Sequence, residues 1–176
     1  MCTLKCESIT EWEWAPNLEW NPNSKGELQT AIKECLKLSS DCSKGPHGPI
    51  GSWNVSGVSD MSDLLYTRVP GANEFNGDIS RWDVSRVTNM DHVFHYASSF
   101  NGDISEWDLS RVKSMQYMFF GASVYNSDIS KWNVSRVVTV AHMFSSASSC
   151  NSDLSKWDVS SVDNMAYMFF EASSFN

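Results

Sequence analysis

Basic residues are scarce in this sequence. It has 13 Lys and Arg against 21 Asp and Glu in 176 residues, a formal net charge of -8. Such a chain repels phosphate groups, so we expect neither a nucleic acid nor an anionic membrane surface as its partner. No apolar run reaches the length of a membrane span, and the opening residues contain no apolar core of a signal peptide. We expect no direct membrane insertion. A cell-surface or extracellular location would need a signal upstream of residue 1; otherwise we expect an organelle or a large complex.

Cysteine is also scarce, with an odd count of five. Five cysteines are too few for a disulfide scaffold, although Cys35 and Cys42 lie close enough in sequence for one bridge. Cys2 and Cys6 have no second pair to complete a zinc site. Histidines occur at positions 92 and 142, 50 residues apart in the sequence. Stacked strands would place these two side chains too far apart to share a metal ion. We expect no metal site and no cofactor.

Catalytic motifs are missing as well. The sequence has no glycine-rich phosphate loop and no dinucleotide fingerprint. Serines are frequent, but none sits in a strand–turn–helix elbow with a histidine and an acid placed around it. We therefore predict that the protein is not an enzyme.

What the sequence does contain is a repeat of 25 residues. One column of the repeat is formed by Phe75, Phe100, Tyr125, Cys150 and Phe175, and a second by Trp82, Trp107, Trp132 and Trp157. An earlier copy begins at Trp53 and holds four extra residues within 66–71. A repeat that cannot bury its apolar side alone must stack on its neighbours.

The apolar residues of one copy suggest its backbone. Trp82 and Val84 alternate, which predicts a short strand with both side chains inward. The later apolar residues, to Ala97, follow at steps of mostly three, which suit a helix or 3₁₀ turn. We predict an α/β solenoid of five ~25-residue repeats with an N-terminal helical cap; the leucine-rich-repeat-like, right-handed form of this coil is what the resemblance described next implies.

The phrase FN-x-D-[IL]-S-x-W-[DN]-[VL]-S-x-V-x-x-M-x-x-MF-x-x-A resembles the bacterial surface-protein repeat grouped with BspA-type leucine-rich repeats. The resemblance covers residues 50–176. Such repeats also occur in protist and algal proteins. The resemblance implies a curved right-handed solenoid, a role in adhesion or protein binding, and no catalytic residues.

The chain before the repeats has a different pattern. Residues 24–42 read as an amphipathic helix in which Ser24 and Glu27 have capping-box spacing. Its apolar stripe can cover the open end of the repeat core. We therefore divide the chain into an N-terminal extension with a capping helix, 1–49, and a five-coil repeat solenoid, 50–176. The last copy stops at Asn176, and we expect its exposed end to be covered by another chain or by further repeats.

Candidate contact residues point outward beside the tryptophans or escape the repeat rhythm. The first group is Arg81, Asp83, Ser85, Glu106, Asp108, Ser110, Lys131, Asn133, Lys156 and Asp158; the second is Trp12, Trp14 and Trp20. Polar outward rows are the surface on which repeat arrays usually bind, although they also occur as solvated faces with weak ion pairs. The repeated tryptophans fill core positions, so we expect them to be packing residues rather than a sugar platform.

The acid column Asp78, Asp103, Asp128 and Asp153 has two possible roles. Each carboxylate can accept a backbone N–H within its own turn, or the column can hold calcium. We predict the first.

The predicted function is a non-catalytic protein-binding or scaffolding module for surface recognition or adhesion, with protein partners. Two alternatives remain. One is an accessory structural subunit of a large complex, for example an algal or protist membrane complex. The other is a calcium-stabilised carbohydrate-binding solenoid.

Overall fold

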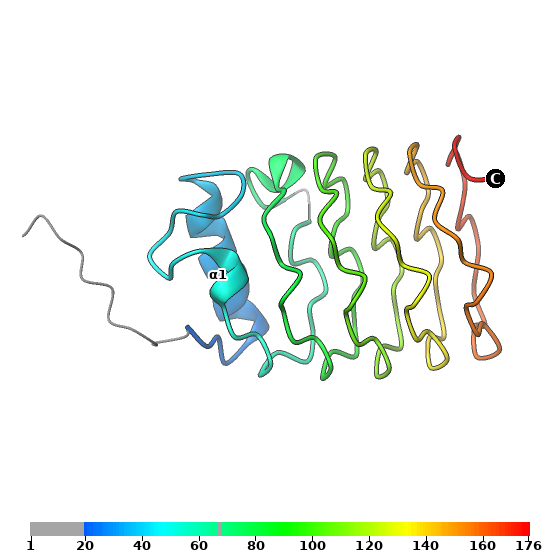
Figure 1. The fold of residues 1–176 in the computed structure, drawn as a ribbon, viewed down its shortest axis with the longest axis horizontal. Coiled ribbons are helices and arrows are strands. Elements are labelled where there is room, and N and C mark those ends of the chain that lie inside the picture. Colours follow the sequence, from blue (N-terminus) through cyan, green and yellow to red (C-terminus); the bar gives the residue numbers. More distant parts are fainter. Residues whose placement is uncertain (1–19, 67) are drawn as a thin grey trace, which may run out of the picture.

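A computed structural model describes residues 20–66 and 68–176. It contains one α-helix, α1 (Lys25–Leu36), and two 3₁₀ helices, η1 (Ile50–Ser52) and η2 (Ala72–Glu74), within these ranges. Beyond α1 the chain winds into coils that lie side by side in one row, and the C-terminus lies at the end of the row away from α1 (Figure 1). Nowhere in the described part is a helix long and apolar enough to cross a bilayer.

The predicted α/β solenoid of leucine-rich-repeat type is wrong. Within residues 20–66 and 68–176 the repeats contain neither an α-helix nor a strand, and their only β-type pairings are isolated parallel bridges. Each pair of neighbouring coils is joined by one such bridge, as between Asn89 and Ser114. A sheet needs consecutive ladder pairs, so one bridge per junction does not make one.

The physical reason lies in the backbone of each coil. His92 and Tyr96 adopt positive φ of 57° and 56°, and the equivalent residues of the three later coils do the same. A left-handed residue interrupts both a strand and a helix. The amides then alternate in partner: His92 N donates to Gln116 O of the next coil at 2.9 Å, and Val93 N to Met90 O of its own turn at 3.4 Å. The result is a stack of hydrogen-bonded turns.

The apolar residues nevertheless face inward as their spacing requires. Trp82 and Val84 are buried and Asp83 between them is exposed, although none of the three lies in a strand. The indole of Trp107 donates Nε1–H to the carbonyl of Ile79 in the preceding coil at 3.2 Å. The same bond recurs for Trp82, Trp132 and Trp157. The repeated tryptophans are therefore buried packing residues that also join neighbouring coils by one hydrogen bond.

Phenylalanine rings form further columns inside the stack. Phe94, Phe119, Phe144 and Phe169 follow one another with ring centroids 5.3, 5.6 and 5.7 Å apart. Cys150 is a buried free thiol in the neighbouring column, as its place among aromatic residues predicted.

Helix α1 closes the first end of the row. Ser24 caps it by accepting from Glu27 N, and the predicted stripe of Leu28, Ala31, Ile32 and Cys35 is buried. The Glu27 carboxylate accepts a hydrogen bond at 2.8 Å from the backbone N–H of Asn23, the residue before the cap. A disulfide joins Cys35 to Cys42, so the pairing that the sequence left open is made.

The chain around α1 also provides hydrogen bonds that a preceding coil would otherwise provide. Ser40 O accepts from Asn76 N at 3.2 Å, and the Gln29 amide donates to Asp63 O at 2.9 Å. These contacts satisfy backbone groups that stacking leaves open at the first coil.

Candidate functional site

The outward residues predicted beside the tryptophans lie in register along successive coils. Asp83, Asp108, Asn133 and Asp158 are all exposed. Each accepts a hydrogen bond from the backbone N–H of the serine two residues later, at 3.0, 2.9, 3.2 and 3.0 Å respectively. Bonds from the Ser110 hydroxyl and backbone lower the pKa of Asp108, and those from Ser160 lower the pKa of Asp158. One side-chain oxygen of each therefore holds a turn, which leaves the second oxygen of each aspartate and the amide nitrogen of Asn133 to meet a partner.

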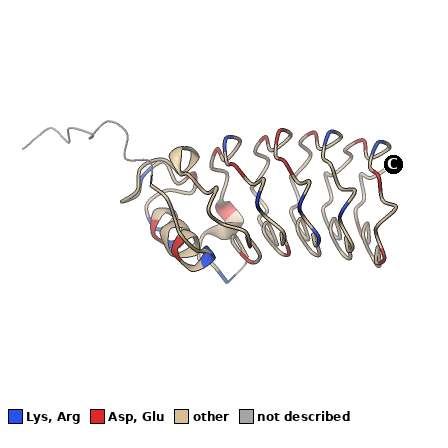
Figure 2. Ribbon diagram, turned by 90° about the horizontal axis from the view of Figure 1, so that it is seen from below, with Lys and Arg blue, Asp and Glu red and all other residues tan. Residues whose placement is uncertain are grey.

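The ten outward residues named from the sequence are called here the polar ridge. Its basic members are also exposed. Arg81, Lys131 and Lys156 stand near acids of the same corner, and the Lys131 ammonium meets the Glu106 carboxylate at 2.8 Å. Lys and Arg are intermixed with Asp and Glu along the coils (Figure 2). Ser85 and Ser110 are half-buried beneath them. The ridge is thus a mixed-charge surface without a strong field of one sign.

The second acid column forms turns in the same way. Asp78, Asp103, Asp128 and Asp153 accept the backbone N–H of the serine two residues later, at 3.0, 3.0, 2.9 and 2.9 Å. This confirms the turn role expected for them. In the part of the chain that the structure describes, no three His, Cys, Asp or Glu side chains are grouped to hold a metal ion.

Of the three N-terminal tryptophans proposed as contacts, Trp12 and Trp14 lie outside the described residues. Trp20 is half-buried and packs at the edge of the core. Its ring stacks on His47 with centroids 4.2 Å apart and meets Trp53 edge-on at 4.8 Å. Trp20 is therefore a fixed ring at the capped end rather than a free one.

A second outward surface was not predicted as a site. It consists of two adjoining rows of rings, called here the aromatic face: Tyr66, His92, His95, Tyr117, Phe120, His142, Tyr167 and Phe170. In the first row His92, Tyr117, His142 and Tyr167 stack in succession at 4.9, 4.5 and 5.0 Å. In the second row His95 stacks on Phe120 at 5.0 Å. The rings are half-buried, except Tyr167 and Phe170, which are 63% and 52% exposed.

The first row occupies a costly backbone position. His92, Tyr117, His142 and Tyr167 all have φ between 55° and 57°, where glycine or asparagine fits best. A bulky residue there costs about 1–2 kcal/mol, and each ring pair returns about 0.5–1.5 kcal/mol. The chain thus places rings on this surface at positions where backbone energetics favour small residues. The signal for this row is present in the sequence, since His92, Tyr117, His142 and Tyr167 follow one another at intervals of 25 residues.

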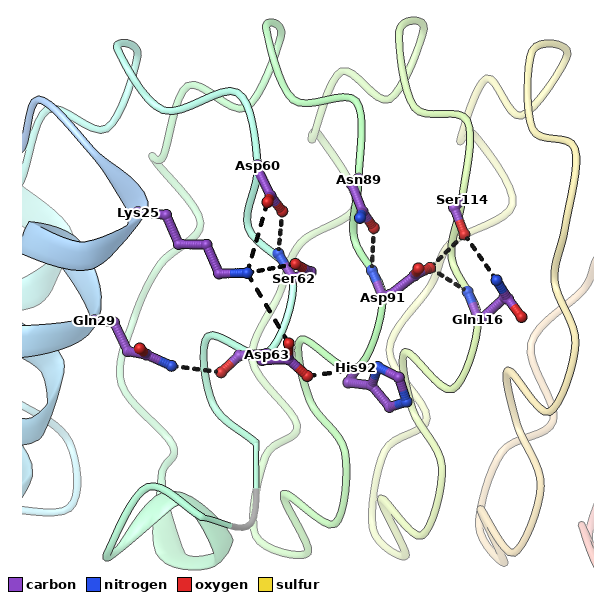
Figure 3. A network of polar contacts seen from close by, with 10 residues as sticks. All are labelled: Lys25, Gln29, Asp60, Ser62, Asp63, Asn89, Asp91, His92, Ser114 and Gln116. Atoms are coloured by element: carbon purple, nitrogen blue, oxygen red, sulfur yellow. Dashed lines mark hydrogen bonds and ion pairs between the residues drawn. The ribbon is translucent and has the colours of Figure 1, made fainter.

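A polar row borders the aromatic face and connects it to α1 (Figure 3). The Lys25 ammonium lies 3.6 Å from Asp60 and 4.0 Å from Asp63, and the other oxygen of Asp63 lies 3.5 Å from His92 Nδ1. Lys25 also donates to the Ser62 hydroxyl. This set joins the cap, the first coil and the second coil.

The polar row continues beyond His92. One Asp91 oxygen accepts from the Ser114 hydroxyl and from Gln116 N, the latter at 2.9 Å. The Ser62 hydroxyl thus accepts from Lys25 of the cap, and the Ser114 hydroxyl donates to Asp91 of the neighbouring coil. The arrangement is suited to holding neighbouring coils in register.

His95 is the ring whose ionisation is most perturbed. Burial, and then the neighbouring His92, lower the pKa of His95 to about 4, against a smaller opposing effect of Asp63. Its Nδ1 is buried and has no hydrogen-bond partner among the described residues, and the same holds for Nδ1 of His142. His95 is therefore neutral near pH 7 and acts there as an aromatic packing residue.

Comparison with protein-family models gives one match. The family described as "Mycoplasma protein of unknown function, DUF285" matches residues 33–137 and again 103–176. The chain belongs to the DUF285 family. No curated protein and no solved structure gives a match.

The two DUF285 matches overlap within the coils, as expected when one family unit can be laid on a repeating chain in two positions. Together they include every residue of the aromatic face and of the polar ridge. Both surfaces are therefore part of the DUF285 region, whereas Trp20 precedes it. The DUF285 match is compatible with the resemblance to BspA-type surface repeats, but it does not show a leucine-rich repeat.

Proposed function

We propose that this DUF285 chain is a non-catalytic protein-binding and scaffolding module, and that it serves recognition or adhesion as BspA-type surface repeats do. The single observation that supports this most is the aromatic face. Eight rings from five successive coils form one continuous, partly exposed surface that the packing of the core does not require.

The geometry of the rings favours a protein as the partner. Tyr, His and Phe offer large contact areas, and Tyr is among the residues enriched at interface hot spots. Stacking already orders these rings, so binding immobilises little additional side-chain freedom. Their planes face one another along the row, so mainly their edges are exposed. A sugar binds by lying on a ring plane, and this arrangement therefore supports protein contact over the carbohydrate alternative.

The disulfide supports a surface role. Disulfides persist in extracellular and other oxidising compartments and are rare in reducing ones. The Cys35–Cys42 bridge fastens the segment that caps the core. A protein exposed to an oxidising exterior would keep this bridge.

A second candidate, an accessory structural subunit of a large assembly, is favoured by the last coil. Val159, Met165, Tyr167 and Phe170 are each at least 40% exposed there. An apolar group of this kind is typical of an interface. In that case the chain would co-purify with its neighbours in fixed stoichiometry, whereas a recognition module would bind and release its partners reversibly.

The proposal is tested by comparing two matched sets of substitutions in the full chain. The first, Tyr167→Ser with Phe170→Ser, removes exposed rings of the aromatic face. The second, Asp83→Asn, Asp108→Asn and Asp158→Asn, removes ridge charge but keeps the acceptor of each turn, as Asn133 already does. Each protein is used as bait in cross-linked extracts of the source cells, with quantitative mass spectrometry of the retained proteins.

We expect the ring variant to lose its specific partners by about tenfold or more, because hot-spot truncations cost about 2 kcal/mol or more. The asparagine variant should keep them. Loss in the asparagine variant alone would place the contact on the polar ridge. Unchanged retention in both would exclude both surfaces.

A further inference from the structure

The capped end of the molecule has a hollow that neither the aromatic face nor the polar ridge includes. It measures about 420 Å³ and lies between one side of α1 and the Trp20–His47 ring pair. That volume is within the range of sites that hold small ligands or single side chains. Glu27, Thr30 and Glu34 line the α1 side, with the small residue Ala31 beneath them.

The aromatic wall of the hollow is held in place before any ligand arrives. Trp20 O accepts from Asn54 N at 3.0 Å, which fixes the chain beside its ring. His47 O accepts from the indole of Trp53 at 3.1 Å, which fixes the other ring. Stacked rings with anchored backbones form a preorganised platform, so little ordering is needed on binding.

The opposite wall is acidic and its charge is not balanced. Glu27 accepts one backbone N–H, from Asn23, and Glu34 makes no hydrogen bond or ion pair with any described residue. Lys33 and Lys37 lie close to Glu34 in the sequence but form no ion pair with Glu27 or Glu34, and Lys25 is engaged with Asp60 and Asp63 on the polar row. Glu34 also lies in the last turn of α1, where an acid opposes the helix dipole. Helix stability therefore does not account for Glu34.

We propose that this hollow binds an arginine side chain of the partner protein. A guanidinium is planar and stacks on aromatic rings, and its fork of N–H groups matches a carboxylate. Trp20 and His47 supply the rings and Glu34 supplies the carboxylate. The overall charge of -8 favours the approach of a basic segment. This inference rests on the proposed protein-binding function and adds the chemistry of one contact.

The test uses the ¹⁵N-labelled full chain and three small probes. N-acetyl-arginine amide carries the charged fork, N-acetyl-citrulline amide has nearly the same shape without charge, and N-acetyl-lysine amide carries a compact charge. Each is titrated while the indole N–H signal of Trp20 and the amide signal of Thr30 are followed by NMR. Variants are Glu34→Gln and, as a matched control, Glu74→Gln, since Glu74 is an exposed acid on η2 outside the hollow.

We expect the arginine probe to shift both signals saturably at millimolar concentrations, the lysine probe to bind more weakly, and the citrulline probe to give no saturable shift. Glu34→Gln should weaken arginine binding about two- to fivefold, the usual effect of one exposed charge contact. Glu74→Gln should leave it unchanged. Equal binding of citrulline and arginine, or an unaffected Glu34→Gln protein, would overturn the proposal.

A second arm separates this contact from the function it rests on. In the extract experiment above, Glu34→Gln should reduce partner retention without changing which proteins are retained. Arginine binding with unchanged retention would overturn the assignment to the partner, even where the ring variant shows that the aromatic face binds protein. If the ring variant keeps all its partners while the hollow still binds the arginine probe, the aromatic face is rejected and the affinity of the hollow for arginine stands.

Discussion

At the scale of single residues, each repeated tryptophan has two structural roles. Each fills the interior and each donates its indole N–H to a carbonyl of the coil before it. An aliphatic residue in that position would remove this bond between neighbouring coils, and the carbonyl would keep only the backbone N–H bond of its own turn. This explains why a ring with a donor, rather than leucine, occupies this position.

Replacing Trp107 by alanine should lower the free energy of unfolding by about 3–5 kcal/mol, because it empties a buried site. Trp107→Phe keeps most of the ring and removes the indole bond to Ile79 O, which still accepts from Trp82 N, so it should cost about 0.5–1.5 kcal/mol. Urea unfolding of both variants measures the two terms separately. An alanine variant within 1 kcal/mol of the wild type would contradict a core role.

His95 should make stability depend on pH in a defined window. Its pKa is about 4 in the folded protein and 6.5 ordinarily, so between these values the unfolded chain binds a proton that the folded one does not. The free energy of unfolding should therefore fall as pH falls from 6.5 toward 4. His95→Phe keeps the contact with Phe120 and should reduce this slope. Parallel pH curves for the two proteins would show that His95 is not responsible.

At the scale of elements, the turn is the building unit and α1 is the exception. Alternate amides bond to the next coil and to their own turn, so each coil before the last depends on the next one for about half of these bonds. The first coil has α1 and residues 40–42 in place of a neighbour. The capping helix was predictable because its apolar stripe and its Ser24 cap are local in sequence.

The Cys35–Cys42 bridge should stabilise this cap rather than the whole molecule. Replacing both cysteines by alanine should cost about 2 kcal/mol, through a freer unfolded loop and lost packing. In hydrogen exchange the amides of α1 should become less protected, while those of Met115 and Met143, in inner coils, should change little. A uniform loss of protection would argue instead for one cooperative unit.

At the scale of the whole molecule, the stack holds its core without a sheet. One-residue bridges, turns and ring columns replace the strand ladder that leucine-like spacing suggested. The polar ridge and the first ring row then follow successive coils, because their positions recur once per 25-residue repeat. The polar ridge was found from sequence, whereas the aromatic face was not, since its two rows come together only when the turns bend around left-handed residues.

This fold should be visible in solution spectra. With only the 12 residues of α1 in α-helix among those described, far-UV circular dichroism should show a weak 222 nm band. The infrared amide I region should lack a strong sheet component. Either a strong helical signal or a strong sheet signal would support the leucine-rich architecture and contradict the turn-based stack.

The sequence by itself determined which side chains face inward and which residues lie above one another, because a 25-residue period reports side-chain direction. It did not determine the backbone, since turns and strands can both bury alternate residues. Which amide bonds to which carbonyl, where φ becomes positive, and that Trp20 meets His47 depend on contacts between segments far apart in sequence. Those contacts exist only once the coils and the cap are packed together, so the tertiary structure alone decided them.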